Sequence, residues 1–196
     1  MLVRAFPVTL FHTHCIKNGV DAPVFSQVEL VHFETWLFEL LHVRYSVVMT
    51  HVIFDWKRTL YDPEKCELLP GAYDLLSALA KKDIPMILIG KGDTVMRAEV
   101  ERLGVRAFFT EITFREGAKE AALFRPYVDS SCPKQTIIVG DRARSELAVG
   151  NSLGATTIWV RQGKFAVEEP ELEVQKPTHV VALLSEVKPL LELLLP

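Results

Sequence analysis

A short apolar segment, Val52-Ile53-Phe54, runs directly into a carboxylate at Asp55. β-Branched and aromatic residues in so short a run are typical of a buried strand. A second segment of the same kind, 136–139, runs into Gly140-Asp141. Carboxylates at the carboxyl ends of strands lie where open α/β sheets bind their ligands. These two strand ends therefore favour a fold in which Asp55 and Asp141 share one edge of a sheet.

Strands and helices are expected to alternate from residue 49 onward. The expected strands cover 48–55, 85–89, 108–110, 136–139, 156–160 and 179–181. The expected helices run from about 71 to 82, from 93 or 94 to 103, from 118 to 128 and through 147–148, followed by a leucine-rich helix at the end of the chain. Such alternation favours a parallel sheet covered by helices on both faces. We therefore predict an α/β fold, namely a three-layer Rossmann-like sandwich whose mainly parallel sheet has five to six strands.

The composition excludes several classes of protein. The chain has 196 residues, of which 49% are hydrophobic and 24% are charged, as in ordinary globular proteins. Its net charge of −3 offers no basic footprint for nucleic acid or an anionic membrane. The three cysteines, Cys15, Cys66 and Cys132, show neither a disulfide framework nor a Cys-x-x-Cys metal site. No apolar run approaches the roughly 18 residues of a membrane span. We therefore expect a cytoplasmic protein without nucleic-acid or membrane partners.

The chain is expected to divide into two parts, because the regular alternation starts only at residue 49. We expect 49–196 to form the core domain and 1–48 to be an N-terminal extension of unknown role. Within this extension, the spacing of the apolar residues predicts an amphipathic helix from Leu30 to Leu41.

The residues at the two strand ends resemble the motifs of the haloacid-dehalogenase-like (HAD) superfamily. Its first motif, Asp-x-Asp-x-Thr-Leu, is matched at Asp55, Thr59 and Leu60. Its fourth motif is matched by Gly140-Asp141 followed by Glu146. The resemblance covers the chain from residue 49 onward, and it implies a phosphatase-like hydrolase.

This resemblance implies a role for each matching residue. Asp55 would attack a phosphoryl group and form an aspartyl-phosphate, which is covalent catalysis by a carboxylate. The Thr59 hydroxyl would tie down the turn beneath the nucleophile. A lysine would bind the phosphate, and Lys119 is the best match for it, with Lys134 and Arg125 as alternatives.

A magnesium site is also implied by the resemblance. Asp55, Asp141 and Glu146 would offer carboxylate oxygens, which are ligands that Mg²⁺ prefers. The main-chain carbonyl of Lys57 would complete the protein ligands. The metal would offset the negative charges of the nucleophile and the phosphate.

Two positions depart from the motifs of the family. Lys57 stands where its phosphatases carry a second Asp, which protonates the leaving oxygen and later activates water. An ordinary lysine is a poor base at pH 7 because it is protonated, and Lys57 either forms a counter-ion to Asp55 or points outward. Gly90 and Lys91 stand where the second motif has a Ser or Thr hydroxyl. A phosphate at this position would depend on the main-chain N–H groups of Gly90 and Gly92.

Three functions remain open at this point. The first is a Mg²⁺-dependent phosphomonoester phosphatase that uses an aspartyl-phosphate intermediate. The second is a HAD-fold protein that has lost turnover and binds a phosphorylated ligand or a protein partner. The third is a 2-haloacid dehalogenase, which Asp141 and Glu146 disfavour because dehalogenases of this family work without Mg²⁺.

The same resemblance implies little or no cap over the site. Only nine residues separate Leu60 from Pro70, which is too few for a helical cap. We therefore expect an open site that takes a small phosphorylated substrate or a phosphoprotein, and a second copy of the chain could cover it.

Overall fold

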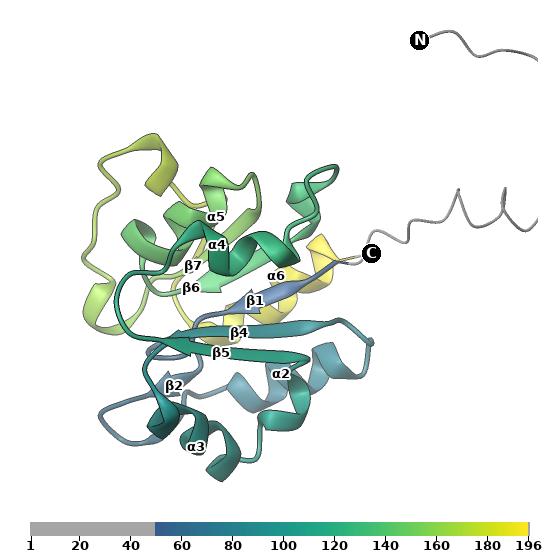
Figure 1. The fold of residues 1–196 in the computed structure, drawn as a ribbon, viewed down its shortest axis with the longest axis vertical. Helices are drawn as coiled ribbons and strands as arrows, with labels where there is room; N and C mark the ends of the chain where they lie inside the picture. Colours follow the sequence, from purple (N-terminus) through teal and green to yellow (C-terminus); the bar gives the residue numbers. More distant parts are fainter. Residues whose placement is uncertain (1–49, 196) are drawn as a thin grey trace, which may run out of the picture. The chain divides into compact units, whose positions relative to one another are not determined.

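The central sheet has six parallel strands among residues 50–195, the part of the chain that the structure describes (Figure 1). In this computed structural model the strands lie in the order β5-β4-β1-β6-β7-β8. Their bounds are β1 Val52–Phe54, β4 Met86–Lys91, β5 Glu111–Arg115, β6 Ile137–Gly140, β7 Thr156–Val160 and β8 His179–Val181. A separate antiparallel hairpin, formed by β2 Tyr61–Asp62 and β3 Glu67–Leu68, follows β1. The predicted α/β fold is confirmed.

Helices cover both faces of this sheet and complete three layers (Figure 1). The helices are α2 Ala72–Ala80, α3 Thr94–Arg102, α4 Ala121–Phe124, α5 Ala148–Ser152 and α6 Val187–Leu194, and a π-helical turn, Ala143–Leu147, leads into α5. Short 3₁₀ turns lie at Arg106–Phe108, Arg125–Tyr127, Pro133–Gln135, Gly163–Phe165, Glu173–Gln175 and Leu184–Glu186.

Successive residues of β1 show how the two faces are filled. Val52 and Phe54 belong to a core cluster that includes residues of α2, α3 and α6. Ile53 belongs to a second cluster with residues of α4 and of the π-helical turn. Side chains of a strand alternate between the two faces of its sheet, and a strand covered on both faces must be apolar throughout. This explains why the segment before Asp55 is an unbroken apolar run.

Several predicted elements differ in extent from the structure, among them the strand expected at 48–55, which is β1 Val52–Phe54. β4 continues to Lys91, beyond the expected end at residue 89. The strand expected at 108–110 is wrong, because Phe108 ends a 3₁₀ turn and packs edge-on against Tyr73 of α2, while the strand follows it. The helix expected from 118 to 128 is reduced to the four residues of α4. Pro126 lacks an N–H and its ring obstructs the preceding turn, so a longer helix would be interrupted there.

The structure also bears on the predicted domain division and on whether a helix could cross a membrane. The chain divides into two units, Met1–Val47 and Val48–Pro196. The expected extension 1–48, with its helix from Leu30 to Leu41, lies outside the described residues. Within 50–195, none of the helices combines the length and apolar character that a bilayer crossing needs.

Candidate active site

Asp55 lies directly after β1, at the carboxyl edge of the sheet. Its main-chain N–H donates to the carbonyl of Val139 at 3.0 Å, which joins the end of β1 to β6. The Thr59 hydroxyl donates to Asp55 Oδ2 at 3.3 Å from a fully buried position. The turn after β1 therefore holds one carboxylate oxygen of Asp55 and leaves Oδ1 for a different partner.

That partner is Lys119, which lies between β5 and α4. Its ammonium donates to Asp55 Oδ1 and, at 3.0 Å, to Glu146 Oε2. The side chains of Lys119, Asp55 and Glu146 are only 9%, 7% and 2% exposed. One lysine thus bridges two buried carboxylates that follow different strands of the sheet.

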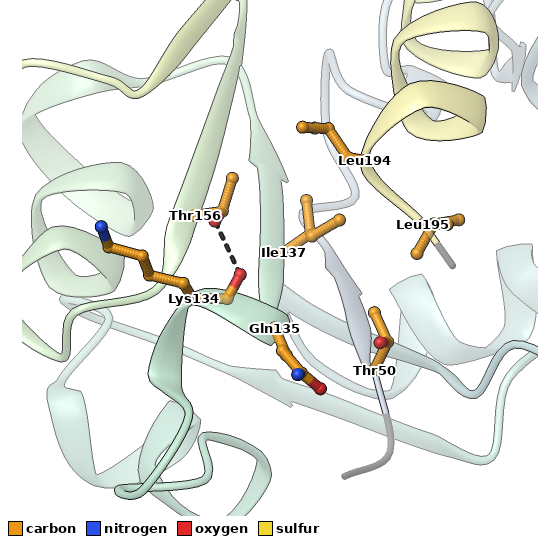
Figure 2. Close-up of a pocket in the computed structure, with 7 residues that line it drawn as sticks. All are labelled: Thr50, Lys134, Gln135, Ile137, Thr156, Leu194 and Leu195. Atoms are coloured by element: carbon orange, nitrogen blue, oxygen red, sulfur yellow. Dashed lines mark hydrogen bonds between the residues drawn. The ribbon is translucent and has the colours of Figure 1, made fainter.

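Of the three residues proposed to bind the phosphate, Lys119 lies beside the acids, whereas Lys134 and Arg125 do not. Lys134 lines a pocket of about 480 Å³ with Thr50, Ile137 and Thr156, which precede or begin β1, β6 and β7 (Figure 2). Parallel strands begin at one edge of the sheet and end at the other, so this pocket lies at the edge opposite to Asp55. Arg125 is exposed at the start of a 3₁₀ turn and forms no ion pair among residues 50–195.

Glu146 reaches the site because residue 140 is a glycine. A Cβ atom at Gly140 would lie 2.4 Å from Glu146 Oε1 and 2.5 Å from its Cγ. The same oxygen accepts the main-chain N–H of Arg142 at 2.9 Å, and Oε2 accepts from Lys119. The Gly-Asp pair of the fourth motif therefore has a steric cause, because the glycine admits the second acid.

A Gly140→Ala variant is expected to lose about 1–3 kcal/mol of unfolding free energy, as overpacked sites do. Urea denaturation measures this loss. The clash is with the Glu146 side chain, so the same change in a Glu146→Ala background should cost markedly less. An equal loss in both backgrounds would place the strain elsewhere.

Asp141 follows β6 and is held through its main chain. The indole N–H of Trp159 donates to the Asp141 carbonyl at 2.9 Å. The side chain is 2% exposed, and its Oδ2 is buried without a hydrogen-bond partner among the described residues. Burial, followed by the charges of Asp55 and Glu146, raises the pKa of Asp141 to about 8. A buried carboxylate oxygen without a partner is one that a cation would stabilise.

The three carboxylates fit a hard divalent cation. Asp55, Asp141 and Glu146 each offer an oxygen, and these oxygens lie within 4.8 Å of one another. An all-oxygen donor set of this kind suits Mg²⁺. The unpartnered Oδ2 of Asp141 is the observation that best supports such a site. Lys119 is the cation that the structure places beside the other two acids.

Burial and charge oppose each other at Asp55 and Lys119. Burial raises the pKa of Asp55, and the nearby Lys119 ammonium opposes this shift. Burial lowers the pKa of Lys119, but the carboxylates of Asp55 and Glu146 outweigh it and leave the pKa above its ordinary value. Lys119 is therefore a permanent cation at neutral pH, and it favours the ionised form of Asp55.

Without metal, the protein is expected to be less stable at pH 8 than at pH 5.5. Between the ordinary pKa of Asp141 and its raised value of about 8, the unfolded chain has lost a proton that the folded chain keeps. Stability then falls as the pH rises. Excess Mg²⁺ should raise the melting temperature by about 5 °C at pH 8, and by less at pH 5.5 where protons compete with it.

Scanning calorimetry with EDTA or Mg²⁺ at the two pH values tests this expectation. An Asp141→Asn variant supplies the control, since it removes the titrating group with little change of shape. It should melt higher than the parent in EDTA at pH 8 and should respond little to Mg²⁺. An unchanged Mg²⁺ response in this variant would exclude Asp141 as a ligand.

Three further residues that the sequence analysis proposed for the site, Lys57, Gly90 and Lys91, form no hydrogen bond or ion pair with Asp55, Asp141 or Glu146 among the described residues. Lys57 is half-buried and forms no ion pair with a carboxylate among residues 50–195, so it is not a counter-ion to Asp55. Gly90 lies within β4, where a Cβ would fall 2.5 Å from the Phe114 ring. Lys91 is exposed at the end of the same strand. The Gly92 N–H donates to the Arg115 carbonyl at 3.1 Å, so it is not free to bind a phosphate.

The sequence did not predict two contacts that support the site. Trp159 binds the Asp141 carbonyl, although its segment suggested only a strand. The Arg142 N–H binds Glu146, whereas its side chain pairs with Glu168. Trp56 is fully buried, stacks on Tyr61 at 5.1 Å between ring centroids and therefore packs the core beneath the site. The contacts of Trp159 and Glu146 are with main-chain atoms, and such contacts leave no pattern in a single sequence.

Comparisons with known proteins agree with this geometry. A family model described as HAD-hydrolase-like matches residues 110–187, which include Lys119, Asp141 and Glu146. The glyceraldehyde 3-phosphate phosphatase of Pyrococcus furiosus is 28% identical over 133 residues, which are 64% of this chain and 54% of that protein. The chain spans about half the length of the curated relatives it matches.

Solved structures share the fold. An uncharacterized protein from Listeria monocytogenes aligns with a TM-score of 0.61 at 20% identity, over 74% of this chain and 98% of that one. The HAD-hydrolase YfnB from Bacillus subtilis, bound to magnesium, aligns with a TM-score of 0.52 at 20% identity, over 67% and 57% of the two chains. The family model over residues 110–187 and the shared fold support a HAD-like hydrolase.

Proposed function

We propose that the protein is a Mg²⁺-dependent phosphomonoester phosphatase in which Asp55 is the nucleophile. The observation that carries this proposal is the cluster of Asp55, Asp141 and Glu146 around a buried Lys119 at the carboxyl edge of the sheet. The magnesium in the YfnB structure and the phosphatase activity named for the Pyrococcus relative support it.

The contacts of Asp55 suit an attack on phosphorus. Thr59 holds Oδ2 and Lys119 holds Oδ1, so the carboxylate is fixed before a substrate arrives. An Asp55 oxygen bonds to phosphorus while the bond to the leaving alcohol breaks. Water then attacks the phosphorus, releases inorganic phosphate and restores the carboxylate. When bound, Mg²⁺ would lower the charge repulsion between the carboxylate and the phosphate.

Lys57, in place of the second acid, is expected to slow both chemical steps of the reaction. The family's phosphatases carry an acid at this position, and general acid–base catalysis contributes roughly 10²–10⁴-fold. Protonation matters less for a good leaving group, so aryl phosphates should turn over faster than alkyl phosphates. Activation of water is also impaired, and we expect the aspartyl-phosphate to accumulate as a burst of product before slower steady turnover.

A second candidate function follows from the same departures. Phe114 and Trp56 fill the space around Gly90, where the second motif has a hydroxyl, and Lys57 replaces the acid. A protein of this kind would bind Mg²⁺ and a phosphorylated ligand or partner without turning it over. The dehalogenase alternative has no comparable support, because the acid cluster suits a divalent cation.

Turnover of an aryl phosphate, with Mg²⁺ or with EDTA, tests the proposal. The phosphatase proposal expects Mg²⁺-dependent phosphate release with an initial burst close to one product per enzyme. Mg²⁺ binding by calorimetry without any phosphate release would favour the second function. Halide release from a 2-haloacid in EDTA would contradict both.

The proposal includes a small phosphorylated molecule as the substrate and a cytoplasmic location. The location rests on the cysteine pattern, since Cys66 and Cys132 are free thiols in the described part of the chain. A second copy of the chain that covers the site stays a prediction.

A further inference from the structure

A pocket of about 390 Å³ lies between the β2–β3 hairpin and the loop that follows β7. Its lining includes Arg58, Asp62 and Glu64 on the first side and Gln162, Gly163 and Lys164 on the second. This volume is within the range of small-molecule sites. None of these six residues takes part in the mechanism proposed above.

The strand order places this pocket beside the acid cluster. β1 and β7 are the two neighbours of β6 in the sheet. Arg58 follows β1 and Gln162 follows β7, whereas Asp141 follows β6 between them. The Gln162 side-chain amide also contacts the Arg58 carbonyl at 3.5 Å, which brings the two loops together. A substrate whose phosphate lies at Asp55 could therefore extend into the pocket.

The acids of the pocket already have partners within the hairpin. Asp62 Oδ1 accepts the main-chain N–H groups of Glu64 and Lys65 at 3.0 and 3.3 Å. Glu64 accepts from the Arg58 guanidinium at 3.0 Å. These contacts, with the Lys65 ammonium 3.8 Å from Asp62, offset part of the negative charge that the two carboxylates bring to the pocket.

The cations of the pocket have donors to spare. The Arg58 guanidinium donates to Glu64 through one nitrogen, and its side chain is 24% exposed. The Lys164 ammonium forms no ion pair with a carboxylate anywhere in 50–195, and it lies 5.7 Å from the centre of the Phe165 ring. The Arg58 guanidinium lies 5.5 Å from the centre of the same ring. Unused donors in a pocket fit a ligand that carries acceptors.

We propose that this pocket binds a second anionic group of the substrate, a carboxylate or a second phosphate, through Arg58 and Lys164. This inference rests on the proposed function, and it narrows the substrate class to phosphomonoesters that carry another negative charge. A guanidinium matches the geometry of either anion, and the lysine adds a mobile point charge. Arg58 also has a left-handed backbone, with φ of 66°, which is uncommon for a residue other than glycine.

Binding to an Asp55→Asn variant in Mg²⁺ tests the inference without any need for turnover. 3-Phosphoglycerate and glycerol 3-phosphate share a three-carbon skeleton and differ by a carboxylate in place of a hydroxymethyl group. Fructose 1,6-bisphosphate and fructose 6-phosphate differ by a second phosphate. Calorimetry should show about tenfold tighter binding of the more anionic member of at least one pair, as one charge-assisted contact provides.

The preference should depend on Lys164 and not on charge in general. Adding Lys164→Gln should reduce the tenfold ratio to about threefold or less. Lys134→Gln is the matched control, because it removes an exposed lysine charge at the opposite edge of the sheet, and it should leave the ratio unchanged (Figure 2).

The outcomes separate this inference from the proposed function. A ratio near one for both pairs, or a ratio that survives Lys164→Gln, overturns the second-anion site. The same holds if none of the four phosphates binds. An aryl phosphate that the unsubstituted protein fails to hydrolyse contradicts the phosphatase alone, since the binding ratios in the variant remain measurable. The pair that shows the preference identifies the anion as carboxylate or phosphate.

Discussion

An Asp55→Asn variant is expected to lose at least about 10³-fold in aryl phosphate turnover while it stays folded. The amide has nearly the same shape as the carboxylate, and its one oxygen can still accept from Lys119 while its NH₂ group faces the Thr59 hydroxyl, but it is a far weaker nucleophile. The buried charge of Asp55 opposes folding through burial and favours it through Lys119, so we expect a modest change in stability. Steady-state kinetics and thermal melting measure the two effects.

An exposed aspartate provides the matched control for this result. Asp74 lies in the first turn of α2 and is exposed, so Asp74→Asn removes the same charge far from the acid cluster. Its turnover should equal that of the parent. Retained turnover in Asp55→Asn would show that a different group attacks the phosphate, or that water attacks directly.

A Lys119→Met variant is expected to be the most destabilised of the single variants considered. Methionine keeps the length and apolar stem but leaves Asp55 and Glu146 buried beside Asp141 without their cation. Removing one partner from a buried ion pair typically costs about 3–5 kcal/mol. The loss should be largest at pH 8 and smaller at pH 5.5, because the unpaired acids can take up protons there.

Denaturant unfolding at both pH values, with and without Mg²⁺, checks this result. Mg²⁺ should recover part of the lost stability, since it supplies positive charge to the same oxygens. Lys188→Met removes an exposed lysine from α6 and should change stability by less than about 0.5 kcal/mol. A Lys119→Met variant as stable as the Lys188 control would mean that the bridge contributes nothing to the folded state.

The strand ends were predictable because the physics behind them is local. A segment such as Val52-Ile53-Phe54 must be apolar on both faces, and the acid after it can only lie at the sheet edge. Parallel strands then bring Asp55 and Asp141 to the same edge without any further information. The same logic gave β7 and β8 with the bounds that the structure shows.

The parts that the sequence missed depend on contacts between distant segments. Phe108 looked like a strand residue, but its ring packs against Tyr73 of α2 and the strand begins after it. Gly90 looked like a turn glycine, yet it lies inside β4 where Phe114 leaves no room for a side chain. The sequence left open whether Lys57 pairs with Asp55 or points outward; among residues 50–195 it pairs with no carboxylate, and Lys119 pairs with Asp55 and Glu146 instead.

The place of Lys119 in the chain makes the site depend on an irregular segment. This residue lies between β5 and α4, outside any helix or strand, and it is 64 positions away from Asp55. Segments of this kind open more readily than the strands beside them. Each local opening of residues 116–120 would release the lysine and leave the two acids to repel each other. The proposed phosphatase would therefore lose its active form below the temperature at which the sheet unfolds, and its inactivation would report on this one connection.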